Sequence, residues 1–412
     1  MAENGPVPTA RTDLRSITLI LARLAMLGPF SINAYLPSFH EMSVVLHTDQ
    51  VALQQTISVY FAAFAFMSLW HGAISDSLGR RKVVLAGLAL YALSSLGCAL
   101  ATRVEHLWVL RALQGCSAGA GIVIGRAVVR DLHDGPLARR MMSQVVMLYG
   151  LAPAVAPLIG AALQVAFGWR SVFLFLGLLA AALFAAVALR LPETLPASAR
   201  QPFNARGLAA GYGELLRHRV FMVWACAYAL MFGAFFVYVL SAPVFLMRHL
   251  GLGESDFIWL FGPATAGLIG GSALASRYAV RWSGNRTLAR GVALMAAANL
   301  YNLAVCMAAP DGGAWYVAYV FVFNLGMSLA VPTLTMRALD CVPARRGMGS
   351  SVQIFVQTGF NALIAAVLAP LAWGSLLSLA IAAAGLSLCA GLATLLANRL
   401  ASLAPSGGPA GA

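Results

Sequence analysis

The segment Gly72-Ala-Ile-Ser-Asp76-Ser-Leu-Gly79-Arg80-Arg81-Lys82 is a short polar and basic turn. An apolar run of about twenty residues, the length that a helix needs to cross a bilayer, lies on each side of it. Its glycines allow a tight turn, and its carboxylate can pair with a cation or cap a neighbouring helix. It lacks the Gly-Lys-Ser/Thr ending of a phosphate-binding loop, so nucleotide binding is a poor fit.

The composition points to a membrane protein. Of the 412 residues, 60% are hydrophobic and only 10% are charged, against about 25% charged residues in soluble domains. An ordinary globular enzyme is therefore excluded. The six cysteines are widely separated and show no C-x-x-C spacing, so we expect neither a disulfide framework nor a zinc site. No metal or cofactor is predicted.

The charged residues divide the chain into apolar runs that are each long enough to span a membrane. Between Arg346 and Arg399 lie 52 residues without a charge, which as one helix would far exceed a hydrocarbon core of about 30 Å. The chain must turn back there, and Pro370 to Gly374 is the expected turn. The predicted spans are 16–39, 51–70, 83–102, 107–125, 141–166, 171–189, 220–247, 257–276, 291–309, 314–336, 348–371 and 375–398.

The positions of the cations predict the orientation. With the N-terminus inside, nearly all arginines fall in cytoplasmic segments, and only Arg103, Arg170 and Arg248 fall outside. This is the positive-inside pattern. We therefore interpret the net charge of +13 as an orientation signal rather than a nucleic-acid surface. The expected location is the bacterial inner membrane, with both termini in the cytoplasm and a retained N-terminal tail.

A long polar segment, 190–219, contains three prolines and divides the spans into six and six. The predicted organisation is an N-terminal half, 1–189, a cytoplasmic linker, 190–219, and a C-terminal half, 220–412. A short surface helix over 207–219 is possible, although its glycines weaken that prediction. The loop 271–286 repeats the glycines and cations of the first-half loop but has no aspartate. The predicted fold class is an all-α membrane protein of twelve transmembrane helices.

Several motifs occur in an order and spacing that resemble a known family. The 72–82 loop resembles the signature loop of the major facilitator superfamily, although a plain orienting loop is the simpler alternative. Together the motifs resemble the Bcr/CflA branch of the drug:proton antiporters, which includes exporters of bicyclomycin and chloramphenicol. The other matching motifs are Asn33-Ala-Tyr35-Leu36-Pro37, Arg111-Ala-Leu-Gln114-Gly115, Gly125-Arg126-Ala-Val-Val-Arg130-Asp131, the span-5 run Gly150 to Gly160, Gly168-Trp169-Arg170 and Leu191-Pro192-Glu193-Thr194.

The resemblance implies the major facilitator fold, with two halves related by an axis along the membrane normal and cargo carried by alternating access. It also assigns gating roles. In span 5, glycine and proline recur on one helix face, which predicts a kink and a pivot, although such residues are common in membrane helices. The expected gating residues are Gly72, Asp76, Gly79, Arg80, Arg81, Arg130, Asp131, Gly150, Pro153, Pro157 and Gly160.

Two cations, Arg23 and Arg111, fall within predicted spans, and charges inside a membrane are functional hypotheses by default. Arg111 is expected near the central cavity, either binding substrate or taking part in proton-linked movement, with a structural anchor as the alternative. Arg23 is a possible charge site that either points inward or extends to the membrane surface.

The remaining cavity candidates are neutral. Gln353, Gln357 and Asn361 form one polar stripe, which would be costly facing lipid. An aromatic stripe on span 7 is either a binding surface or ordinary packing. Such a pocket suits neutral or anionic amphiphiles better than cations. The aromatic and further polar candidates are Tyr228, Phe232, Phe235, Tyr238, Asn324, Gln114 and Tyr149.

No acidic residue falls inside a predicted span. Asn33 occupies a position where the resembled branch usually carries an aspartate, and an amide cannot gain and lose a proton. Proton coupling through that position is therefore in doubt. Other titratable candidates lie near span ends, where we expect solvated interface residues: Asp76, Glu41, Asp340, His40 and His71.

The sequence thus predicts a secondary active transporter that exports small amphiphilic compounds, such as antibiotics, and is driven by the proton motive force. We expect a monomer in the lipid bilayer. One alternative is a dedicated exporter of an endogenous metabolite such as a siderophore, and another is a transporter-like membrane sensor. No metalloprotease motif or nucleophile elbow supports an enzyme.

Overall fold

A computed structural model describes residues 14–132, 135–278, 281–308 and 315–403, and the side chains at 14–15, 135–140, 143 and 146–150 are not described. The described residues form helices and connecting loops, with no strand among them. Eleven helical segments are long and apolar enough to cross a membrane, and a further apolar segment, Leu151–Phe167, belongs to α7.

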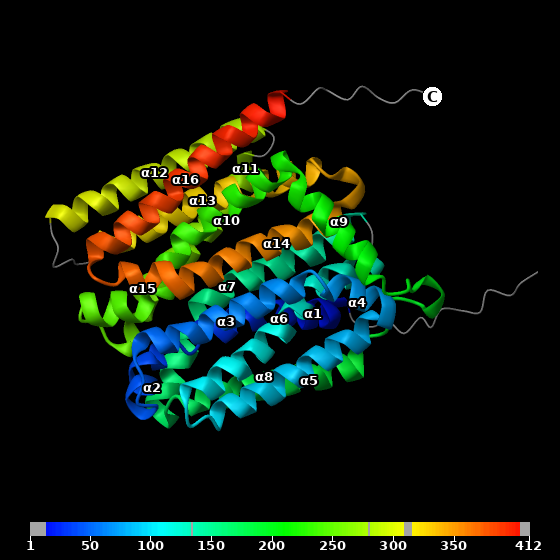
Figure 1. Cartoon of the computed structure of the whole chain (residues 1–412), viewed down its shortest axis with the longest axis horizontal. Helices are drawn as coiled ribbons and strands as arrows, with labels where there is room; N and C mark the ends of the chain where they lie inside the picture. The colour runs from blue at the N-terminus through cyan, green and yellow to red at the C-terminus, as the bar shows by residue number, and fades with distance from the viewer. Residues whose placement is uncertain (1–13, 133–134, 279–280, 309–314, 404–412) are drawn as a thin grey trace, which may run out of the picture.

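The helices of spanning length alternate in direction along the chain (Figure 1). Six precede the linker and six follow it. Their bounds are α1 Leu14–Asn33, α3 Gln50–Ser68, α5 Arg80–Ala99, α6 Val104–Leu132, α7 Gly135–Phe167, α8 Arg170–Arg190, α10 Arg219–Leu240, α11 Ile258–Tyr278, α12 Gly284–Ala308, α13 Trp315–Asp340, α14 Arg346–Leu363 and α16 Leu376–Leu403.

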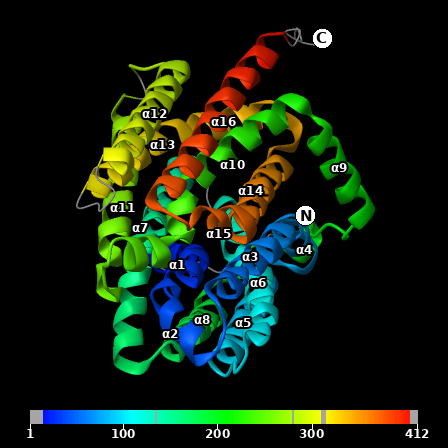
Figure 2. The same ribbon diagram turned by 60° about the vertical axis from the view of Figure 1, so that its left-hand side comes forward.

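Short helices mark the two ends of the bundle. The α2 end carries α2 (Phe39–Val45) and α15 (Ala369–Ala372), whereas the α4 end carries α4 (His71–Leu78) and the linker helix α9 (Ala205–Arg217). In Figure 2, α9 lies at the edge of the molecule and leads from the first group of helices to α10. The expected surface helix in the linker is therefore present.

The two groups of helices repeat one packing scheme. In the first, α6 packs against α3 and α5, and α1 packs against α7. In the second, α13 packs against α11 and α12, and α10 packs against α14. Contacts between the groups come chiefly from α3 with α14 and from α7 with α11. The structure is therefore a repeated bundle, and the contacts of α3 with α14 and of α7 with α11 form the seam between its halves.

The predicted spans differ from the helices at several ends. The helix α6 ends at Leu132 rather than residue 125, α7 begins at Gly135 rather than 141, and α12 begins at Gly284 rather than 291. The first helix stops at Asn33 rather than residue 39, and Leu36–Ser38 forms a 3₁₀ turn, consistent with the restriction that Pro37 places on the preceding residue. The seventh stops at Leu240 before a π-helical segment, Val244–His249. The eleventh changes to π-helix at Ile364–Leu368. The predicted return after Pro370 is confirmed, since α16 begins at Leu376.

Candidate functional site

Arg111 lies on α6 inside the first half and is fully buried. One helical turn further on, Gly115 faces the backbone of α3. A Cβ at Gly115 would collide with the carbonyl oxygen of Tyr60, so this glycine allows α3 and α6 to approach closely. The close approach is what brings the ring of Tyr60 beside the guanidinium.

The Arg111 guanidinium lies between two aromatic rings. Its Cζ atom is 4.6 Å from the ring centre of Tyr35 and 4.4 Å from that of Tyr60. Nη1 donates to Ser31 Oγ at 2.9 Å and to Gln114 Oε1 at 2.7 Å. Nε and Nη2 are buried and find no hydrogen-bond partner among the described residues. Since burying a charge is costly unless it is paired, the rings carry much of its stabilisation.

The polar network of Arg111 extends to four helices. Gln114 Nε2 donates to Ser95 Oγ at 2.7 Å, and Ser95 Oγ donates to the Tyr91 carbonyl at 2.7 Å. Tyr35 and Thr56 share a hydrogen bond of 2.8 Å between their hydroxyl oxygens. The network therefore links α1 and the turn after it to α3, α5 and α6. Arg111 and Gln114, both predicted site residues, lie together in this half rather than on its outer surface.

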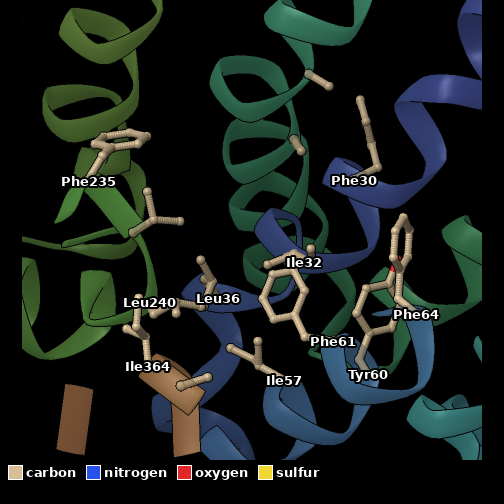
Figure 3. Close-up of a cluster of buried hydrophobic side chains, with 14 of the residues drawn as sticks. Phe30, Ile32, Leu36, Ile57, Tyr60, Phe61, Phe64, Phe235, Leu240 and Ile364 are labelled. Atoms are coloured by element: carbon tan, nitrogen blue, oxygen red, sulfur yellow. The ribbon is translucent and has the colours of Figure 1, made fainter. Parts of the chain in front are cut away.

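A row of aromatic rings crosses the seam between the halves. On α10, Tyr228 stacks on Phe232 at 6.1 Å, and Phe232 contacts Phe236 at 5.1 Å between ring centres. Phe236 then meets Phe61 of α3 at 6.0 Å. Figure 3 shows Phe61 and Ile57 near the buried side chains of the other half. Tyr228, Phe232 and Phe236 are each only partly buried.

The predicted aromatic stripe is thus split. Phe235 is buried and contacts Phe236 at 6.2 Å, whereas Tyr238 turns into the second half, where its hydroxyl accepts a hydrogen bond of 2.7 Å from Asn302 Nδ2. Phe236 was not predicted, although it completes the i, i+4, i+8 series that begins at Tyr228. Spacings of three and four residues over ten positions cover more than one helix face.

The amide candidates fall into separate places. On α14, Gln353 and Asn361 are buried and Gln357 is partly buried. Asn324 lies on α13 next to Gly267 of α11, and its Nδ2 donates to the Val320 carbonyl at 2.8 Å. It therefore lies at a helix contact within the second half.

Two candidates on α1 differ in burial. Asn33 is buried, and its Nδ2 donates to the Pro29 carbonyl at 2.8 Å, while Oδ1 finds no partner in the described structure. Arg23 is exposed. It shares a helix face with Ser16, which accepts a hydrogen bond from Arg190 of α8. The side chain of Tyr149 lies outside the described part of the chain.

The 72–82 loop forms an ion-pair cluster, here termed the latch. The guanidinium of Arg80 pairs with Asp76, with Asp131 at 3.1 Å and with Ser75 Oγ at 2.7 Å. Asp131 also accepts a hydrogen bond of 3.0 Å from Thr194 Oγ1. Arg81 donates to the Ala188 carbonyl. The latch therefore connects α4, α5, α6 and the segment after α8.

Glu193 caps the helix that follows the latch loop. Its carboxylate accepts hydrogen bonds from the backbone N–H groups of Arg80 at 2.9 Å and Arg81 at 3.3 Å. Gly79 has φ +102°, and a Cβ there would lie 2.5 Å from Glu193 Oε2. A carboxylate at a helix N-terminus satisfies free N–H groups and the helix dipole. The sequence analysis quoted Glu193 without assigning it this role.

The other gating candidates are distributed along α6 and α7. Arg130 is exposed, and Gly72 lies near Val123. The helix α7 continues through Pro153 and Pro157. Pro157 and Gly160 are buried, and a Cβ at Gly160 would collide with the Ala34 carbonyl. The surroundings of Gly150 are not described.

None of the described aspartates and glutamates is buried. Glu41 accepts a hydrogen bond of 3.0 Å from the backbone N–H of Trp169, next to the start of α8, and exposed Asp340 pairs with Arg346 at 2.9 Å. His40 is exposed as expected. His71 is 3% exposed, so its prediction as a solvated residue is wrong. Among the described residues, no group of histidine, cysteine, aspartate and glutamate could hold a metal.

Comparisons with known proteins identify the relatives of this chain. A family model described as Major Facilitator Superfamily matches residues 21–366. The "Bicyclomycin resistance protein homolog" of Haemophilus influenzae is 28% identical over 355 residues, covering 85% of this chain and 88% of the relative. The "Chloramphenicol resistance protein" of Pseudomonas aeruginosa is 29% identical over 339 residues, covering 81% and 79%. The resemblance to the Bcr/CflA branch is confirmed.

A third relative carries no substrate in its name. The "Uncharacterized MFS-type transporter YdgK" of Bacillus subtilis is 35% identical over 273 residues, covering 66% of this chain and 68% of the relative. Among solved structures, a D-xylose-proton symporter aligns with a TM-score of 0.72 at 15% identity, over 93% of this chain and 97% of that structure. This structural match shows a shared fold.

Replacing Glu193 with alanine should loosen the start of α5. Loss of a capping group costs about 0.5–2 kcal/mol, so we expect a Tm lower by about 1–3 °C and faster amide exchange over 79–83. Thermal unfolding and hydrogen exchange of the purified protein would measure this. Glu105→Ala, which removes an exposed acid from the first turn of α6, is the control. Equal exchange at 79–83 in all three proteins would contradict the capping role.

Replacing Arg111 with lysine should destabilise the first half although the charge is kept. Lysine cannot place a planar cation between Tyr35 and Tyr60, and a desolvated cation–π contact contributes about 2 kcal/mol. We expect a Tm lower by about 3 °C. Arg170→Lys is the matched control, because Arg170 stacks on Trp169 at 4.4 Å but is only partly buried. Equal loss in both variants would show that burial of Arg111 adds nothing.

Proposed function

Because the chain belongs to the major facilitator superfamily, a family of transporters rather than enzymes, we propose that it exports small amphiphilic compounds of the antibiotic type by alternating access. The names of its relatives, which include bicyclomycin and chloramphenicol resistance proteins, support this cargo class. The two halves would rock about the seam that α3, α14, α7 and α11 form. Cargo would bind between them.

The observation that carries the proposal is the aromatic row at the seam. Tyr228, Phe232 and Phe236 recur at every fourth residue along one face of α10, each is partly buried, and the row reaches Phe61 in the other half. Flat aromatic faces suit the ring portion of an amphiphilic molecule. With no buried carboxylate among the described residues, the site favours neutral or anionic cargo over cations.

We propose the orientation in the membrane from the charges. The α4 end carries the latch cations and the arginines of the linker, which supports a cytoplasmic position for this end by the positive-inside rule. The termini of the described chain lie at the same end, because α1 starts and α16 ends there. We therefore place the α2 end outside the inner membrane. The transporter would act as a monomer.

We propose the proton motive force as the energy source, without a cofactor. Asn33 cannot supply the titrating group, because an amide does not bind and release protons at physiological pH. Solute flux into proteoliposomes, measured over a panel of compounds with and without an imposed pH gradient, tests transport and coupling together. Binding without flux would instead favour a transporter-like sensor.

A second candidate is export of one endogenous metabolite, such as a hydroxamate siderophore. The observation that favours it is the lack of a buried carboxylate among the described residues, together with the buried cation of Arg111. A permanent cation suits an oxygen-rich or anionic ligand, which would reach Arg111 only in a state in which the surrounding helices open. The same panel separates the candidates, because a dedicated exporter would move one compound class and leave unrelated antibiotics behind.

Replacing Phe232 with alanine should impair transport of aromatic cargo. One aromatic contact contributes about 0.5–1.5 kcal/mol beyond its buried area, so transport efficiency should fall about 3–10-fold. Phe184→Ala, which removes a ring from the exposed side of α8, is the control. Flux of an aromatic substrate in proteoliposomes would measure both. If the two variants transport equally well, the row is packing and not a binding surface.

Replacing Asn33 with aspartate should introduce a new pH dependence of transport, because a buried carboxylate titrates above its usual range. A closely matched control exists on α12. Asn299 is also buried, donates from Nδ2 to the carbonyl four residues earlier at 2.8 Å, and leaves Oδ1 without a partner in the described structure. We expect Asn33→Asp to shift the pH profile of flux and Asn299→Asp to leave it unchanged. Identical shifts would show that position 33 has no special role in proton coupling.

A further inference from the structure

His71 is a buried titratable side chain that the transport site does not use. It is the first residue of α4, directly after the break at Leu69 and Trp70 that separates α4 from α3. Its side chain is 3% exposed. The other described histidines are exposed or partly buried. It therefore lies at the hinge from which the latch helix would swing.

The imidazole lies against the small residues of α6. A Cβ at Gly119 would be 3.3 Å from both Cε1 and Nδ1 of His71 and 3.6 Å from the ring of Phe64. The backbone of Cys116 hydrogen-bonds the ring, whereas Nδ1 is buried and has no partner among the described residues. One ring nitrogen therefore has a hydrogen-bond partner, and the other is buried against α6 without one.

The titratable groups near His71 are either charged residues of the latch or neutral side chains. On α4 itself, Asp76 pairs with Arg80 of α5, and both are more than one helical turn along the chain. On α6, Cys116, whose backbone hydrogen-bonds the ring, carries a partly buried thiol. From the linker, the Tyr212 hydroxyl donates to the Leu69 carbonyl at 2.6 Å. None of these contacts gives the imidazole a carboxylate partner.

We propose that His71 is a proton-binding site that couples proton uptake to opening of the latch. The inference rests on the proposed proton-driven transport, but it concerns a conformational step that can be observed without cargo. With α4 packed on α6, the imidazole is neutral and dry. When α4 moves away, water reaches the ring and the histidine can bind a proton. The protonated ring then opposes closing, because none of the described acidic side chains pairs with it in the closed site.

The sign of the linkage follows from the burial. In the closed latch, which lies between the spanning helices α3 and α5, desolvation lowers the pKa of His71 to about 4, although the hydrogen bond to Cys116 raises it in part. In the open latch the pKa returns toward the usual value of about 6.5. The closed state is therefore fully stable above the open-state pKa and loses stability as the pH falls below it.

Hydrogen exchange of the full-length protein in lipid nanodiscs tests this proposal. After correction for intrinsic exchange, peptides covering 71–82 should exchange about tenfold faster at pH 5.5 than at pH 7.5, as the two pKa values require. His71→Gln keeps a neutral polar side chain and should abolish this response. His106→Gln, which changes an exposed histidine at the start of α6, should retain it.

Two outcomes would overturn the proposal. One is a pH response in His71→Gln equal to that of the wild type, and the other is no response in the wild type. If His71→Gln does not fold, His71→Asn takes its place, and the wild-type midpoint must fall between about 4 and 6.5. Because exchange needs no cargo, a persistent difference between wild type and variant alongside proton-independent flux would refute proton-driven transport while leaving the His71 switch in place.

Discussion

A permanent positive charge buried in an apolar bundle is the constraint on which the first half depends. Arg111 cannot lose its proton, and its side chain has no access to water. It is held by two tyrosine rings and by the oxygens of Ser31 and Gln114. These partners come from three different segments, so their positions are fixed relative to each other. Among the described residues of the second half no arginine is buried, and the neutral pair Tyr238 and Asn302 is buried there instead. The halves share a fold and differ in electrostatics.

The acidic groups complement this arrangement by lying at the ends. Glu193 caps α5 at the α4 end, and Glu41 accepts a hydrogen bond from Trp169 at the α2 end. Each lies beside a glycine with positive φ, Gly79 at +102° and Gly168 at +78°. The two carboxylates are thus committed to helix N-termini, where they offset the dipole. Any movement of α5 relative to the linker must break the Glu193 contacts first.

The sequence predicted the number and order of the spanning helices because charges are expensive inside a bilayer and therefore lie near the span ends. The return near Pro370 followed from length alone. Side-chain surroundings were harder to predict, since helical periodicity gives the face of a residue but not the neighbour that covers it. Tyr238 and Phe235 have spacings that suit one stripe, yet one turns toward Asn302. Asn324 looked like a cavity residue and lies at the contact with Gly267 instead.

His71 illustrates the same difficulty in a more consequential way. Its position at a span end suggested a solvated side chain, because the sequence does not show that α3 breaks before it and that α6 offers Gly119 as a flat surface. The burial of this position against Gly119 favours an imidazole over a carboxylate as the proton-binding group. A carboxylate in this buried contact would be costly while ionised. An imidazole can be buried neutral without a counter-ion and still bind a proton once water enters. A latch already rich in ion pairs can therefore respond to pH through the one described histidine that lies beneath it.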